Sequence, residues 1–391
     1  MSDTGATNWR RVALGGAGGM FLGMGVGRFS YTAMLPAIIE SGQLTEFEAG
    51  IVGGLNLAGF LVGAFFTEML RRAMPIRVLL GLAVWLSFLA LACSALPWGF
   101  QWLAVWRGLL GITTAVIMVQ SLALATAAAP AGQRATATSF IFAGVGMGIF
   151  LSGSLIPWLL DFGLAGAWGG VAAVGLLGAV LAQWGYGAAE DGAPDAPATT
   201  SAASDGWPWR KLVAAHCLFS FGIVPHTIYW VDFITRELGK GIEVGGLHWS
   251  VVGVFAFVGP WFTAWLARRI GTGWALVAAF VGLTAGIAGP ALATAAVVLF
   301  ASSVLFGAQP GVSTVMAARA RDMGTAAAMP RMMRTTILAN ATAAAVGGLL
   351  IPSIFEATGS YDLLFLIGGG AMAAGAVLCV PRGAAKTIST G

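Results

Sequence analysis

The stretch GMGVGRFSYTAMLP, residues 23–36, decides which kind of fold this chain has. It lies inside an apolar segment that starts after Arg10 and Arg11 and ends near residue 39, which is long enough to cross a bilayer, since about 20 apolar residues suffice. Arg28 lies in the middle of the segment, where a charged side chain costs several kcal/mol on insertion scales. Charge inside a membrane is usually functional, so the stretch predicts a polar site in a bundle of spanning helices. The alternative is an arginine held by backbone carbonyls for packing alone.

The composition supports the membrane class. Of the 391 residues, 58% are hydrophobic and 9% charged, whereas a soluble domain has about 25% charged residues. The apolar runs are long and continuous, without the alternation of barrel strands, so we predict an all-α integral membrane protein. The net charge of +4 comes from short basic clusters between apolar runs and does not indicate a nucleic-acid surface. The three cysteines are dispersed and predict no disulfide framework or metal site.

Polar breaks divide the chain into about twelve predicted spans. The longest break, residues 188–207, is rich in Ala, Pro, Ser, Thr and Asp and predicts a flexible linker. We therefore expect an N-terminal six-helix bundle (1–187), a cytoplasmic linker (188–208) and a C-terminal six-helix bundle (209–391). The predicted spans cover residues 12–39, 46–69, 76–96, 99–128, 135–160, 164–187, 210–236, 247–267, 273–290, 292–317, 331–355 and 362–380.

Local signals refine this outline. Thr45 and Glu48 predict a capping box at the start of the second span. Pro36 is expected to loosen the first span. Almost all basic residues between the spans fall on one side of the predicted bundle, and only Arg236 and Lys240 fall on the other. Because cytoplasmic loops are enriched in Lys and Arg, both termini and the linker are expected in the cytoplasm, in a bacterial inner membrane.

The two halves of the chain repeat weakly at a spacing of 200 residues. Arg10 and Arg11 precede the first span as Arg210 and Lys211 precede the seventh. Gly111 in the fourth span likewise corresponds to Gly311 in the tenth. Parallel repetition of a six-helix half is typical of one transporter architecture.

Several motifs resemble those of the major facilitator superfamily, over essentially the whole chain. RGLLG (107–111) fits the RxxxG pattern, whose arginine is buried in many members. LARRIG (266–271) is similar to the gating-loop motif L-A-D-R-x-G, with Arg268 in the place of the aspartate. The first-half loop, residues 63–77, is more degenerate. The first and fifth spans, GVGRFSYTAMLP and FAGVGMGIFLSGSLIP, resemble the YbfB/YjiJ-type branch, which is largely without assigned substrates.

This resemblance implies a secondary transporter that works by alternating access, with spans one, four, seven and ten around a central cavity and no cofactor. It also implies cytoplasmic gating loops. The residues expected in these loops are Glu68, Arg71, Arg72, Arg268 and Arg269.

Arg28 and Arg107 are the leading candidates for binding a substrate. At 1.5 Å per residue they lie at similar depth on spans one and four. Two buried guanidinium groups repel unless an anion lies between them, and the planar fork suits a carboxylate. The sequence therefore favours a small organic anion as substrate. In the alternative, Arg107 is structural and ties span four to span one through backbone carbonyls.

The seventh span supplies the second group of candidates. Pro225 interrupts it, as in the discontinuous helices that line transporter sites. His226 can exchange a proton near neutral pH, so His226 and Asp232 are proposed for proton coupling. Alternatively, His226 is hydrogen-bonded within the bundle, and Asp232 pairs at the surface with Arg236 one turn later.

Neutral side chains complete the expected lining. Tyr31 follows Arg28 in the first span, and Tyr229 and Trp230 flank the break at Pro225. Asn56 and Gln309 are polar positions in spans two and ten, and Pro310 is expected to disrupt the helix beside Gln309.

Three functions remain open at this point. The first is proton-coupled uptake of a small organic anion by a monomeric transporter. The second is proton-driven efflux of amphipathic drugs or metabolites, which predicts a membrane-embedded acid for cations. The third is a non-transporting membrane sensor, which predicts an added soluble domain or long tail. The sequence carries no Walker lysine, no Ser/His/Asp order and no metal-ligand cluster that would support an ATPase or an enzyme.

Overall fold

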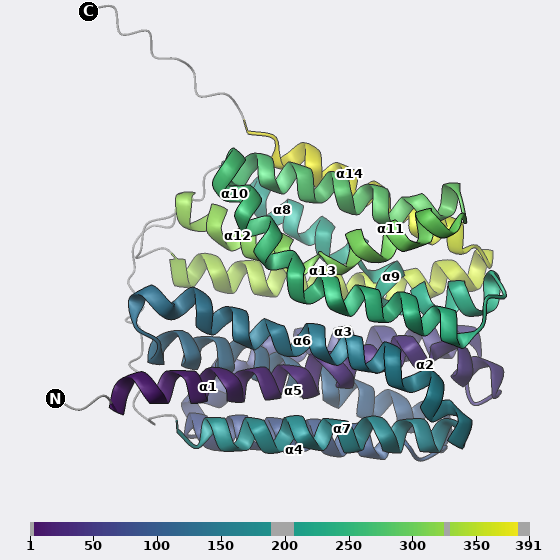
Figure 1. Ribbon diagram of the computed structural model, residues 1–391, viewed down its shortest axis with the longest axis horizontal. Coiled ribbons are helices and arrows are strands. Elements are labelled where there is room, and N and C mark those ends of the chain that lie inside the picture. Colours follow the sequence, from purple (N-terminus) through teal and green to yellow (C-terminus); the bar gives the residue numbers. More distant parts are fainter. Residues whose placement is uncertain (1–3, 189–206, 324–328, 382–391) are drawn as a thin grey trace, which may run out of the picture.

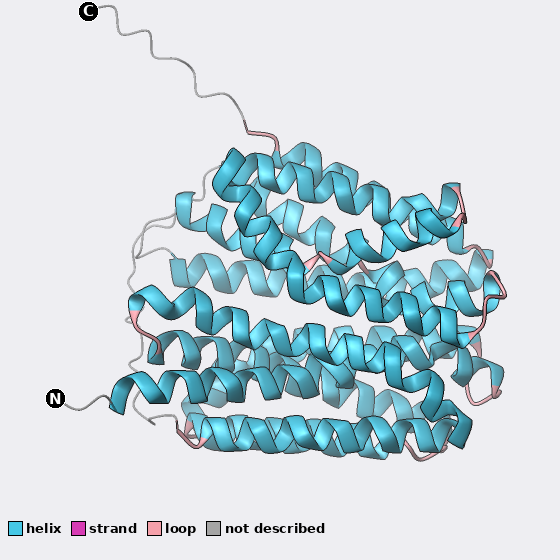
Figure 2. Cartoon of the chain, in the orientation of Figure 1, coloured by secondary structure: helices cyan, strands magenta, loops and turns pink. Residues whose placement is uncertain are grey.

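The computed structural model describes residues 4–188, 207–323 and 329–381. All regular secondary structure in this part of the chain is helical, and short loops join the helices (Figure 2). The helices run side by side along the long axis of the molecule (Figure 1). The N-terminal half of the chain forms α1 (Thr4–Met20), η1 (Phe21–Arg28), α2 (Phe29–Glu40), α3 (Glu46–Ala73), α4 (Ile76–Cys93), α5 (Gly99–Ala128), η2 (Ala131–Gln133), α6 (Arg134–Leu159), η3 (Leu160–Phe162) and α7 (Gly163–Tyr186).

The described part of the C-terminal half is likewise a series of helices. Its first helix starts at Trp207, three residues before the predicted start of the seventh span, and residues 189–206 of the linker lie outside the described residues. Its helices are α8 (Trp207–Gly222), α9 (Val224–Asp232), η4 (Phe233–Glu237), α10 (Ile242–Leu292), α11 (Ala296–Gly307), α12 (Pro310–Met323), α13 (Met329–Thr358) and α14 (Tyr361–Cys379).

Ten helical segments of the described chain are long and apolar enough to cross a membrane. Two of them, Thr136–Tyr186 and Ile242–Leu292, contain 51 residues each. Each of these two segments changes direction at a glycine with positive φ, at Gly163 (φ 75°) and Gly271 (φ 82°). Large apolar side chains such as Phe65, Leu177 and Val297 are exposed, as expected where a helix faces lipid.

The first span differs from the prediction at its centre. The α2 helix continues through Pro36 to Glu40, so this proline does not interrupt it. The irregularity lies earlier, where residues 21–28 form a π-helix that ends at Arg28. Gly25 lies in this π-helix and packs directly on Gly148 of α6. A side chain at either position would prevent this close approach. Such π-helical turns are uncommon and occur often at functional sites.

The other two predicted breaks are present. The chain leaves the α-helix at Ile223, between α8 and α9, and Pro225 lies in the first turn of α9. Ala308 and Gln309 separate α11 from α12, which begins at Pro310. The capping box is also confirmed, since the Thr45 hydroxyl accepts from the Glu48 N–H and the Glu48 carboxylate accepts from the Thr45 N–H.

The bundle has two ends, which we name by the linker. At the linker end, α1 begins, α3 meets α4, α7 ends and α8 begins. At the far end, α2 meets α3 and η4 meets α10. The two halves of the chain pack together through α3 against α13 and α6 against α10. These contacts are close because glycines face backbone: a Cβ on Gly54 would overlap the carbonyl oxygen of Gly348.

Candidate functional site

Arg107 lies at the centre of the N-terminal half and is 1% exposed. Its Nη1 donates to the carbonyl oxygen of Gly27 (2.5 Å) and its Nη2 to that of Arg28 (2.9 Å). The guanidinium also lies over the ring of Tyr31, 4.7 Å from the centroid. Arg107 therefore ties α5 to the end of the π-helical segment through backbone carbonyls. This is the geometry of the structural alternative, and it does not present Arg107 as a fork beside Arg28.

Two further contacts hold this tie in place. The Asn56 amide donates to the carbonyl oxygen of Arg107 (3.0 Å), and the Tyr31 hydroxyl donates to the carbonyl oxygen of Ala49 (2.7 Å). Both side chains are buried, so Asn56 and Tyr31 use their donors to join α3 to α5 and α2. The Oδ1 atom of Asn56 and the Nε atom of Arg107 are buried without a hydrogen-bond partner in the described chain.

Arg28 differs from Arg107 in having an unengaged guanidinium. The Arg28 side chain is half-buried. Within the described residues, no group accepts a hydrogen bond from its guanidinium and no acid forms an ion pair with it. Its guanidinium lies 5.4 Å from the centroid of the Phe29 ring. The indole of Trp249 donates to the Phe29 carbonyl (3.2 Å), and the Thr32 hydroxyl donates to the Thr227 carbonyl (2.5 Å). Arg28 thus lies beside the contacts at which the two halves of the chain meet.

Asp232 is part of a polar network at the far end. Its side chain is 0% exposed, and its Oδ2 accepts from the Tyr361 hydroxyl at 2.5 Å. Arg236 lies one turn later, with Nη1 3.4 Å from both carboxylate oxygens of Asp232, and its Nη2 reaches Glu46 of α3 at 2.5 Å. The predicted Asp232–Arg236 pair is therefore present, but its placement at the surface is wrong because α14 covers the carboxylate through Tyr361. The network joins the two halves of the chain.

His226 lies in an aromatic cluster inside the C-terminal half. Its ring is fully buried and stacks on Trp230, with centroids 4.5 Å apart, and Phe306 and Phe365 pack around it. Nε2 is 3.0 Å from the Ser302 hydroxyl, while Nδ1 has no partner in the described chain. The described hydrogen-bond and ring contacts of His226 thus include no carboxylate.

The remaining lining candidates are buried in different surroundings. The indole of Trp230 donates to Ser303 (3.2 Å). Tyr229 is fully buried, and its hydroxyl, which has no partner in the described chain, lies against Gly50 of α3. Gln309 lies at the break between α11 and α12 and is 8% exposed.

The gating-loop candidates lie at the linker end. Glu68 pairs with Arg71 (3.6 Å) and Arg72 (3.2 Å) on the same helix, at partly exposed positions. Arg268 and Arg269 lie three and two residues before the bend at Gly271, and Arg269 lies over the Trp265 ring. Exposed pairs of this kind contribute little to stability.

Sequence reasoning missed four participants. Glu46, Tyr361 and Ser302 contact candidate residues or their partners from distant parts of the chain, and Trp249 contacts the backbone of Phe29, next to Arg28. One signal was available for Tyr361: the chain has only four tyrosines, and Tyr31, Tyr229 and Tyr361 all lie in or beside the candidate site. Among the described residues there is no group of His, Cys, Asp and Glu side chains that could hold a metal ion.

Comparisons with known proteins agree with this architecture. The sequence matches the family described as "Uncharacterised MFS-type transporter YbfB" over residues 20–380. The fold is similar to that of a D-xylose-proton symporter crystal structure, with a TM-score of 0.74 and 15% identity, over 95% of this chain and 97% of that chain. At this identity the likeness shows the fold alone. No curated protein matches the sequence.

Proposed function

Because the chain belongs to the YbfB family of MFS-type transporters, we propose that it carries out proton-coupled uptake of a small organic anion, a carboxylate, by alternating access. Binding by Arg28 and coupling through Asp232 are the two parts of this proposal. The transporter acts as a monomer, without a cofactor and without enzymatic activity.

The proposed architecture is twelve spanning helices in two six-helix bundles, residues 1–187 and 209–391. A 51-residue segment is about 75 Å long as a helix at 1.5 Å per residue, more than twice the hydrocarbon thickness of about 30 Å. Each of the two long segments therefore supplies two spans, which turn at Gly163 and Gly271.

Packing at the 200-residue spacing supports two related bundles. Gly59 packs on the carbonyl of Gly108, and Gly259 packs on that of Ala308. Gly54 of α3 packs on Gly348 of α13. The other contact between the halves is similar, since Gly253 of α10 packs on the backbone of Phe150 in α6.

We place the linker end in the cytoplasm of a bacterial inner membrane, following the distribution of basic residues. In this orientation the Thr32–Thr227, Trp249–Phe29 and Arg236–Glu46 contacts hold the two bundles together on the external side. The structure then corresponds to a state closed to the outside. Rocking of one bundle against the other would break these contacts.

The unengaged guanidinium of Arg28 is the observation that carries the substrate assignment. Burying a cation without a partner is costly, so a half-buried arginine in a membrane span favours an anionic ligand. Arg107 supports this site by fixing the backbone carbonyls of Gly27 and Arg28, so it orients Arg28 rather than binding the anion.

Asp232 is the proposed coupling residue. Its buried carboxylate is held by Tyr361 and Arg236, and Arg236 also binds Glu46 of the other bundle. Protonation of Asp232 removes its charge and so weakens its pairing with Arg236, which changes a contact between the bundles. A proton can in this way be linked to opening at the external side.

The test uses the purified protein and a panel of carboxylates, amino acids, sugars and lipophilic cations. Ligand binding to the folded state raises the Tm. We expect carboxylates to raise it in the native protein and in the matched control Arg134→Ala, an exposed arginine at the linker end. We expect no rise in Arg28→Ala. Carboxylate stabilisation that persists in Arg28→Ala would overturn the assignment of Arg28, and stabilisation by sugars or amino acids alone would overturn the anion class.

Proton-driven efflux of amphipathic compounds is the second candidate. The observation that favours it is the buried carboxylate of Asp232, the membrane-embedded acid that this function predicts. A rise in Tm with lipophilic cations alone, which is lost in Asp232→Asn, would favour efflux over anion uptake.

A further inference from the structure

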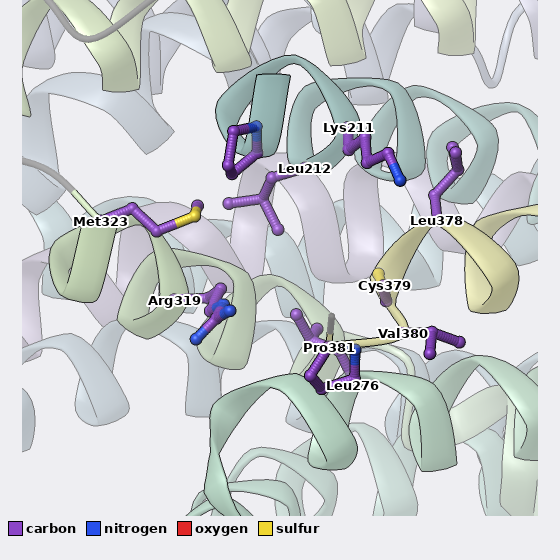
Figure 3. Close-up of a pocket in the computed structure, with 10 residues that line it drawn as sticks. Lys211, Leu212, Leu276, Arg319, Met323, Leu378, Cys379, Val380 and Pro381 are labelled. Carbon is purple, nitrogen blue, oxygen red and sulfur yellow. The ribbon is translucent and has the colours of Figure 1, made fainter. Parts of the chain in front are cut away.

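A separate cavity of about 200 Å³ lies at the linker end of the C-terminal half. Residues of α8, α10, α12 and α14 line it, together with the residues that follow α14 (Figure 3). Its walls are mainly apolar, from Leu212, Leu276, Met323 and Leu378. None of the candidate substrate or coupling residues contributes to it.

Two cationic side chains line this apolar cavity. Lys211 comes from α8 and Arg319 from α12, and the two approach from different sides (Figure 3). The described residues that line the cavity include no Asp or Glu. The nearest acid on α12, Asp322, accepts a hydrogen bond from Thr272 (2.8 Å) and does not line the cavity.

We propose that this cavity binds the phosphate-bearing headgroup of an anionic phospholipid. Guanidinium and ammonium groups are the usual partners of phosphate oxygens, and here they are supplied from two helices. The volume is below the roughly 300–1,000 Å³ of pockets for drug-sized ligands, so it suits a phosphate with its attached glycerol. The apolar walls suit the beginning of the acyl chains.

The location agrees with a lipid ligand. Basic pockets between helices on the cytoplasmic side bind anionic headgroups, and the cytoplasmic leaflet is rich in anionic lipids. This step rests on the orientation given under the proposed function, but not on transport or on any substrate.

Binding would have a structural consequence for α12. The turn at Ala308 and Gln309 separates this helix from α11, so α12 is held mainly by its own neighbours. A phosphate bridging Arg319 and Lys211 would join α12 to α8. The bound lipid would therefore stabilise the C-terminal half.

Cys379 lines the same cavity and serves as a local reporter. The test uses the full chain with Cys93→Ala and Cys217→Ala, which leaves Cys379 as the single thiol. The rate of its modification by a small thiol reagent is measured in detergent with added phosphatidylglycerol, phosphatidylcholine or inorganic phosphate. We expect phosphatidylglycerol to slow the reaction several-fold, phosphatidylcholine to leave it unchanged, and Arg319→Gln to abolish the protection. Arg321→Gln, an exposed arginine on the same helix, is the matched control and should retain it.

Each outcome bears on the proposal. If inorganic phosphate protects Cys379 equally well, the ligand is a free anion and not a lipid. If the protection is unaltered by Arg319→Gln, or is equal for both lipids, the headgroup site is overturned. If Cys379 does not react, the Tm with each lipid gives the answer: a rise with phosphatidylglycerol that is lost in Arg319→Gln and kept in Arg321→Gln supports the site, and no such difference overturns it. Because no transport substrate is present, either result is independent of the anion-uptake hypothesis.

Discussion

Arg107 donates a hydrogen bond from Nη2 to the backbone carbonyl of Arg28, at 2.9 Å. Two intramembrane arginines that the sequence places at one depth are thus not equivalent. One guanidinium is engaged by backbone, and the other is left without an acceptor in the described chain. We propose that this difference separates a positioning residue, Arg107, from a binding residue, Arg28, and the two roles can be distinguished by experiment.

The first prediction contrasts the two arginines. Arg107→Ala removes the two hydrogen bonds that the guanidinium donates to the Gly27 and Arg28 carbonyls, and a hydrogen bond from a charged group contributes about 1.5–3 kcal/mol. We expect a clearly lower Tm for Arg107→Ala and little change for Arg28→Ala in thermal unfolding in detergent. The rise in Tm on carboxylate binding should show the opposite order: it should be lost completely in Arg28→Ala and to a smaller extent in Arg107→Ala. A larger loss of Tm in Arg28→Ala than in Arg107→Ala would contradict these roles.

The second prediction concerns the contact between Glu46 and Arg236. Glu46→Gln removes the charge that Arg236 reaches across the two halves. We expect the far end to open more often, so that a cysteine placed at Thr32 reacts faster with a membrane-impermeant thiol reagent. Glu40→Gln, at an exposed position of the same end, is the matched control. Equal labelling rates in both variants would show that the pair does not hold this end closed.

The third prediction tests coupling at Asp232. In proteoliposomes, Asp232→Asn should abolish accumulation of substrate driven by an inward proton gradient, because the side chain can no longer exchange a proton. Exchange of substrate at equilibrium should persist. Tyr361→Phe removes only one hydrogen bond to this carboxylate and should have a weaker effect. Gradient-driven accumulation by Asp232→Asn at the native level would exclude this residue as the coupling group.

The fourth prediction concerns His226. Its ring is enclosed by Trp230, Phe306 and Phe365 and bonded to Ser302, so we expect it to act through packing. His226→Gln should lower the Tm but leave the pH dependence of uptake unchanged. A shifted pH profile at unchanged Tm would instead assign proton exchange to His226.

The fifth prediction tests the close approach of α3 and α13. A Cβ on Gly54 would overlap the carbonyl of Gly348, whereas a Cβ on Gly108 meets no atom within 4 Å. Gly54→Ala should therefore reduce folding yield or Tm, and Gly108→Ala should be tolerated. Similar behaviour of the two variants would show that the interface can separate without cost.

Periodicity and charge predicted much of the architecture. The predicted span at residues 99–128 coincides with α5, and the breaks at Pro225 and Pro310 occur where proline removes a backbone donor. These features follow from local chemistry, because length, apolar composition and proline act within a single segment. The π-helical turn before Arg28 was not predicted, since it depends on how Gly25 packs against α6.

By itself the sequence determined that the chain spans a membrane, roughly which segments are helical, and that Arg28, Arg107 and Asp232 lie among apolar residues. Tertiary structure alone decided what each charge contacts. The carbonyls of Gly27 and Arg28, the hydroxyl of Tyr361 and the carboxylate of Glu46 come from other helices, and they lie 79 to 190 residues along the chain from the side chains that they contact. A hydrogen bond depends on distances of a few ångströms, and linear spacing does not specify which helices meet.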